Sequence, residues 1–129
     1  MGAASSGRDV VQMRLPAAGV YLSVLRTATA ALAARLDFTL DEIEDLRIAV
    51  DEACALLLPD AEPGSAMTCV FALTDQTLAV TVTVPSRTGR VPRRNTFAWT
   101  VLTALAGDVD TAVGDGTVSV TLLKRGGQG

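Results

Sequence analysis

The sequence of 129 residues contains no histidine. This absence excludes Ser-His-Asp and Cys-His nucleophilic catalysis, zinc held by histidine, and phosphate transfer through phosphohistidine. Any chemistry must therefore rest on carboxylates, on backbone N–H groups that bind phosphate, or on arginine and lysine side chains.

Cysteine and long apolar runs are also scarce. Cys54 and Cys69 form no CxxC pair, and we interpret them as buried thiols of a protein in a reducing cytoplasm. The longest uncharged stretch covers the 13 residues 95–107, which is too short to cross a bilayer. The N-terminus lacks the basic and apolar regions of a signal peptide. We therefore expect a cytoplasmic protein without a membrane segment.

Hydrophobic residues make up 49% of the chain, which indicates a folded domain with a buried core. We expect one domain over residues 9–125, between short tails at residues 1–8 and 126–129.

Charge is distributed unevenly along the chain. Residues 37–62 contain nine acidic residues and only one base, Arg47, although the whole chain has a net charge of only −3. The sequence SRTGRVPRRN, residues 86–95, carries Arg87, Arg90, Arg93 and Arg94, and we call it the arginine loop. Both segments are candidate surfaces for a charged partner.

Hydrophobic periodicity and turn residues predict three helices and five strands. We expect the second helix to begin after Thr39, with Glu42 completing a capping box, and to end before Pro59. Asn95 is the predicted cap of the third helix. The predicted helices cover residues 17–36, 40–58 and 95–106, and the predicted strands cover residues 9–16, 66–74, 77–85, 108–113 and 117–124.

This order of elements predicts the fold class. Strands that follow one another in sequence pair antiparallel, and the helices gather on one face of the sheet. We therefore predict an α/β (α+β) two-layer sandwich with a mainly antiparallel mixed sheet.

The second predicted helix carries the most specific motif. In EIEDLRIAVDEACALL the residues Asp45, Ala49, Val50, Glu52 and Ala53 match the pattern D-x-x-x-A-V-x-E-A-x-x-N. This pattern resembles the bacterial anti-sigma factors of the serine-kinase type, which have the ATPase fold of histidine kinases.

Two further segments carry the same resemblance. The upstream segment VYLSVLRTATAALAARLDFTLDEI is similar to the first helix of that family, including an arginine at Arg26, and NTFAWTVLTALAGDV is similar to its late helix and following strand. The resemblance covers roughly residues 9–125. It implies the histidine-kinase-like ATPase fold, a sigma factor and an anti-anti-sigma protein of the STAS type as partners, and a homodimer that pairs through the first helix and the sheet edge.

The nucleotide site that the resemblance implies is degenerate in this sequence. Glu52 matches the glutamate that polarises the attacking hydroxyl, but Leu56 replaces the asparagine that ligates Mg²⁺, and a leucine offers no oxygen donor. The segment PSRTGR has no acid and one glycine, Gly89, where the family has D-x-G-x-G. The next glycine is Gly107, so the lid whose backbone would approach the phosphates is missing. We therefore expect a divergent branch of the family with a lost or weak ATP site and with no bound metal or cofactor.

Two explanations of the acidic stripe are open. Asp45 and Glu52 are either the solvated face of an ordinary helix or a binding surface, on which Glu52 is the vestige of a general base. By resemblance, Arg26 contacts the sigma factor; the alternative is that it pairs only with an acid of the second helix.

Three functions follow from these observations. The first is an anti-sigma factor that binds and sequesters a sigma factor through Arg26, Asp45 and Glu52. The second is an active serine/threonine kinase that phosphorylates an anti-anti-sigma protein, which Leu56 and the missing glycines oppose. The third is a nucleic-acid binder that uses the arginine loop, which the acidic balance of the chain and its scarcity of aromatic residues oppose, so we expect no direct contact with nucleic acid.

Overall fold

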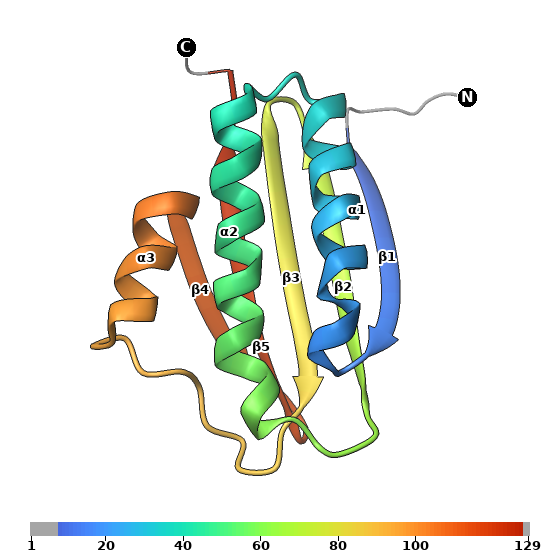
Figure 1. Cartoon of the computed structure of the whole chain (residues 1–129), viewed down its shortest axis with the longest axis vertical. Coiled ribbons are helices and arrows are strands. Elements are labelled where there is room, and N and C mark those ends of the chain that lie inside the picture. Colours follow the sequence, from blue (N-terminus) through green and yellow to red (C-terminus); the bar gives the residue numbers. More distant parts are fainter. Residues whose placement is uncertain (1–7, 128–129) are drawn as a thin grey trace.

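A computed structural model describes residues 8–127 of the chain. Five strands form one sheet in the order β1-β2-β3-β5-β4, and all four neighbouring pairs are antiparallel (Figure 1). The strands are β1 (Arg8–Pro16), β2 (Ala66–Thr74), β3 (Thr77–Pro85), β4 (Asp108–Val113) and β5 (Thr117–Arg125).

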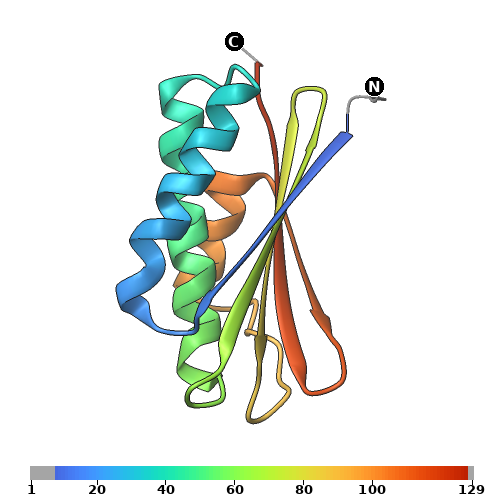
Figure 2. The same ribbon diagram turned by 90° about the vertical axis from the view of Figure 1, so that its right-hand side faces the viewer.

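The three helices all cover one face of this sheet, as Figure 2 shows. They are α1 (Leu22–Arg35), α2 (Leu40–Leu57) and α3 (Phe97–Ala106), and α2 lies between the other two (Figure 1). This arrangement confirms the predicted two-layer α+β sandwich.

Helix α2 starts where the sequence predicts. The Thr39 hydroxyl accepts a hydrogen bond from the Glu42 backbone N–H at 3.1 Å, and the Glu42 carboxylate accepts one from the Thr39 N–H at 2.7 Å. These reciprocal bonds satisfy two N–H groups that a helix start would otherwise leave unpaired. The buried side of α2 consists of Leu46, Ala49, Val50, Ala53, Cys54 and Leu57, which recur at helical spacing.

The strands alternate between a buried and an open side, as a pleated sheet requires. Phe71, Val80 and Leu122 point toward the helices and are fully buried. On the opposite, open side, hydroxyl groups bond across strands: Thr81 with Thr121 at 3.0 Å, and Thr83 with Ser119 at 2.8 Å. One face of the sheet therefore contributes the core, and the other carries small polar side chains.

Some predicted boundaries are wrong. Residues Gly19–Tyr21 form a 3-10 turn, so α1 begins at Leu22 and not at residue 17. The cap of α3 is Thr96 and not Asn95, because the Thr96 hydroxyl accepts the Trp99 N–H at 3.2 Å. Strand β1 already includes Arg8, so the predicted tail at 1–8 is one residue too long; residues 1–7 lie outside the described residues.

Candidate functional site

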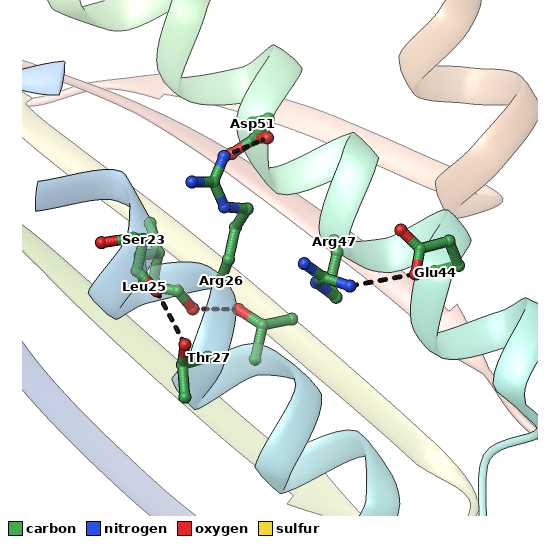
Figure 3. A network of polar contacts seen from close by, with 8 residues as sticks. Ser23, Leu25, Arg26, Thr27, Glu44, Arg47 and Asp51 are labelled. Carbon is green, nitrogen blue, oxygen red and sulfur yellow. Dashed lines mark hydrogen bonds and ion pairs between the residues drawn. The ribbon is translucent and has the colours of Figure 1, made fainter. Parts of the chain in front are cut away.

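The candidate site is built around α2, which has α1 on one flank and α3 on the other (Figure 1). Arg26 of α1 reaches the first flank: its Nη1 donates to Oδ2 of Asp51 at 2.9 Å, and both side chains are about one-third exposed (Figure 3). The structure thus shows that Arg26 forms an ion pair with the acidic helix; a contact with a sigma factor stays a prediction.

This ion pair is incompletely satisfied. The other carboxylate oxygen of Asp51, Oδ1, is buried and has no hydrogen-bond partner among the described residues. A partly exposed pair of this kind contributes only about 0–1 kcal/mol, but removal of the guanidinium would leave Asp51, whose Oδ1 is buried, without a partner. A guanidinium has five N–H donors, so Arg26 can bind a second carboxylate while it keeps Asp51. Nearby, Arg47 pairs with Glu44 along the helix at 3.0 Å, so it is partly neutralised (Figure 3).

The other predicted acids lie toward α3. Asp45 Oδ2 is 3.8 Å from Lys124 Nζ, and the same ammonium group donates to the Leu105 carbonyl at 2.8 Å. Glu52 follows Asp45 by seven residues, which is two helical turns along the same stripe. Glu52 is half-buried and forms no hydrogen bond or ion pair with another residue in the described range. Arg26 and Asp45 therefore mark opposite flanks of α2 and do not converge on one point.

Leu56 lies one turn beyond Glu52 on the α3 flank. Its side chain is partly buried and packs against the hydrophobic core. The position where the family motif has an amide oxygen is therefore occupied by core packing. Residues 8–127 also contain no group of three or more histidine, cysteine, aspartate or glutamate side chains arranged to hold a metal ion.

The segment that leaves β3 is held by an acid that sequence analysis missed. The Asp60 carboxylate, just after α2, accepts hydrogen bonds from Ser86 Oγ at 2.6 Å and from Thr88 Oγ1 at 2.5 Å. Its carbonyl accepts the Arg87 N–H at 2.8 Å, and Ser86 Oγ accepts the Gly89 N–H at 2.9 Å. These bonds to Ser86 and Thr88 lower the pKa of Asp60. We call this set of contacts the Asp60 anchor; because its partners are 26 and 28 residues away, no local pattern signals it.

The arginines of the arginine loop differ in whether they have a partner within the structure. The Arg94 guanidinium lies 4.9 Å from the centroid of the Trp99 ring and 3.7 Å from Asp110, so it stabilises the start of α3. The side chains of Arg90 and Arg93 are exposed and form no ion pair within residues 8–127. Only part of the cluster is therefore available to an acidic partner.

Comparison with known proteins finds relatives of one kind. An anti-sigma-F factor RsbW from Mycobacterium tuberculosis is 34% identical over 105 residues, which cover 81% of this chain and 62% of the relative. A serine-protein kinase RsbW from Bacillus cereus is 35% identical over 76 residues, or 57% of this chain and 48% of the relative. Over 81% of its length, the chain is similar in sequence to an RsbW protein. The resemblance to anti-sigma factors of the serine-kinase type is thereby confirmed.

The fold is shared as well. A crystal structure of RsbU and RsbW domains from Mycobacterium tuberculosis superposes with a TM-score of 0.71 over 91% of this chain and 32% of that chain, at 16% identity. This likeness confirms the ATPase-like fold. No family model matches the sequence, and the chain spans only about half to six-tenths of the two RsbW relatives named above. Within residues 8–127, no helix is long and apolar enough to cross a membrane.

Proposed function

We propose that this protein is an anti-sigma factor, which binds and sequesters a sigma factor in the cytoplasm. The observation that carries the proposal is Arg26, which matches the arginine of the family in sequence register and is held by one ion pair, with Asp51, in which both side chains are about one-third exposed. The mycobacterial relative, which matches over most of this chain, is itself named an anti-sigma factor.

The acidic end of the molecule supports the choice of partner. Residues 37–62 hold nine acidic side chains and one arginine, and this potential would steer a basic protein surface toward α2. On this proposal, Asp45 and Glu52 belong to the partner-binding surface together with Arg26. Glu52 has no partner of its own among the described residues, so it is open to a donor from outside the chain.

We further propose that the ATP site is lost or weak. Mg²⁺ requires hard oxygen ligands in near-octahedral order, and Leu56 supplies packing instead. The segment after β3 is bonded to Asp60 through Ser86 and Thr88, and no glycine follows Gly89 before Gly107. Flexible backbone that could close over phosphates is therefore missing from the segment where the family has it.

The alternative is an active serine/threonine kinase that phosphorylates an anti-anti-sigma protein of the STAS type. The relatives named serine-protein kinases favour it, as does Glu52 at the position of the general base. Isothermal titration of the protein with Mg²⁺ and ATP separates the two functions. Low-micromolar affinity, or transfer of labelled phosphate to a partner serine, would support the kinase.

A homodimer is the assembly we propose. Strand β1 is an edge strand, so one row of its backbone N–H and C=O groups has no neighbour within the sheet. Helix α1 and the 3-10 turn before it lie on the same flank (Figure 1), and they expose Val24 and Val20, respectively. Light scattering of the purified protein would test this pairing, and mass at the monomer value across micromolar concentrations would refute it.

A tag on this protein, expressed in its native cell, tests the main proposal. We expect a sigma factor to co-purify and to be released when Arg26 is replaced by glutamate. Absence of any sigma factor from the purified complex would contradict the anti-sigma function itself.

A further inference from the structure

A groove of about 640 Å³ lies on the open face of the sheet, away from the helices, where β1 ends and β2 begins. Its lining includes Arg14, Thr68 and Thr83, which the strand register places side by side across β1, β2 and β3. A groove of this size is within the range of small-molecule sites. It is separate from the α2 surface, which lies on the other face of the sheet (Figure 2).

The groove has the electrostatic character of an anion site. Its lining contains one cation, Arg14, and four hydroxyl side chains, but no carboxylate. Arg14 is exposed and forms no ion pair with any residue in the described part of the chain. A guanidinium group presents a planar fork of donors that matches a carboxylate or a phosphate, so this unneutralised charge favours an oxyanion.

Ser65 provides an independent observation. Its hydroxyl oxygen is buried and makes no hydrogen bond with the described residues, and Ser65 lines the same groove. By contrast, Thr83 in the same groove is satisfied by Ser119 at 2.8 Å. A buried polar atom without a partner is costly, and rotation of the Ser65 side chain about its Cα–Cβ bond would let the hydroxyl donate to a ligand in the groove.

The rest of the lining is apolar. Pro16 and Pro85 line the groove together with Ala66, and the register pairs Pro16 with Ala66 at the end of β1. These side chains offer a surface on which an apolar group can pack, next to Arg14. A ligand that uses the whole groove therefore has an acidic head and an apolar body.

We propose that this groove binds a small organic anion, a carboxylate or a phosphate monoester, through Arg14 and Ser65, with its apolar part on Pro16 and Pro85. This site is independent of sigma-factor binding, and it gives the molecule a place to take up a small ligand on the face opposite the proposed partner surface.

Nuclear magnetic resonance titration of the ¹⁵N-labelled full chain tests the site. The probes are phenyl phosphate and benzoate, which combine an acidic group with an apolar ring. Inorganic phosphate tests the acidic group without the ring, and benzyl alcohol tests the ring without the acidic group. We expect phenyl phosphate or benzoate to shift the amide signals of Ser65, Thr68, Thr83 and Thr117. Inorganic phosphate should bind more weakly, and benzyl alcohol should not bind. The tighter of the two aromatic probes identifies the head group as phosphate or carboxylate.

Variants assign the binding to named side chains. Arg14→Gln should weaken binding roughly tenfold or more, and Ser65→Ala should weaken it by a smaller factor. Arg35→Gln, which removes an exposed arginine at the end of α1, is the matched control and should change nothing. The unshifted signals of the core residues report that each variant is folded.

Four results would overturn the proposal. The first is that the shifts fall on the arginine loop and not on the groove. The second is that Arg14→Gln binds as tightly as the parent. The third is that inorganic phosphate binds as tightly as phenyl phosphate. The fourth is that no probe causes shifts at millimolar concentration.

Discussion

The two flanks of α2 differ in the contacts that their side chains make. On the α1 flank, Arg26 is in the position that the family motif predicts and forms an ion pair with Asp51, in which both side chains are about one-third exposed. On the α3 flank, Leu56 packs into the core and the segment after β3 is bonded to Asp60. The α1 flank carries a partly exposed ion pair. The α3 flank carries Asp45 and Glu52, but Leu56, at the position where the family motif has an amide, is packed against the core. This difference favours a binding protein over an enzyme.

The largest expected effect comes from the core that both flanks share. Leu46 is fully buried on the sheet-facing side of α2, so Leu46→Ala should lower the free energy of unfolding by about 2–5 kcal/mol. Urea denaturation followed by circular dichroism measures this change. Leu40→Ala, at an exposed leucine of the same helix, is the control and should leave the midpoint nearly unchanged. Equal effects of the two variants would show that the packing of α2 is described wrongly.

A charge reversal on the α1 flank should affect binding more than stability. Arg26→Glu removes the guanidinium and places a carboxylate near Asp51, and we expect sigma-factor affinity to fall at least tenfold, or about 1.4 kcal/mol. The ion pair that is lost contributes about 0–1 kcal/mol to folding, and repulsion between the new carboxylate and Asp51, whose Oδ1 is buried, adds a further cost. Calorimetry with the co-purified sigma factor measures the affinity, and a thermal melt measures the stability.

Arg35→Glu makes the same charge change at an exposed position of the same helix. It separates a specific contact from a general effect of charge. If both variants bind alike, Arg26 serves only the internal pair with Asp51.

Restoring one ligand on the α3 flank should not restore nucleotide binding. Leu56→Asn supplies an amide oxygen, but the glycine-containing segments are still absent, so we expect no gain in affinity for ATP with Mg²⁺. The loss of a half-buried leucine should cost about 1 kcal/mol of stability. Micromolar ATP binding by this variant would show that Leu56 alone prevents nucleotide binding. The α3 flank would then still be able to hold a nucleotide, contrary to the proposal.

The smallest expected effect concerns the Asp60 anchor, and it depends on pH. Because Ser86 and Thr88 lower the pKa of Asp60 in the folded state, the anchor is complete above the ordinary pKa of 3.8 and weakens as the pH falls through the lowered value. At neutral pH, Asp60→Asn should speed hydrogen exchange at the Thr88 and Gly89 amides without changing exchange in β3. Asp75→Asn, at an exposed turn, should have no such effect.

Local patterns predicted most of the fold. The capping box at Thr39 and the helical spacing of Leu46, Val50 and Ala53 placed α2 correctly, and alternation placed the β2–β3 hairpin, because these signals depend on neighbours in sequence. The predicted cap of α3 is one residue too early. Asn95 and Thr96 are both suitable cap residues, and the Thr96 hydroxyl is the one that accepts the hydrogen bond from the Trp99 N–H.

The candidate site was less accessible to sequence analysis. Arg26 was recognised through the family motif, but its distance to Asp51 depends on how α1 and α2 pack. The Asp60 anchor joins residues far apart in the chain, and its hydroxyl partners resemble ordinary loop residues. The groove at Arg14 depends on the register of three strands. Contacts of this kind are set by tertiary structure, so composition and periodicity do not reveal them.

The most direct test of the account is sigma-factor binding measured with and without nucleotide. The purified protein, stripped of nucleotide and magnesium, is titrated against the sigma factor that co-purifies from its native cell, and the titration is repeated with Mg²⁺ and ATP. The account predicts a stable complex of the same affinity in both conditions and no phosphate transfer. Binding that requires ATP, phosphorylation of a partner serine, or no sigma-factor complex at all would contradict it.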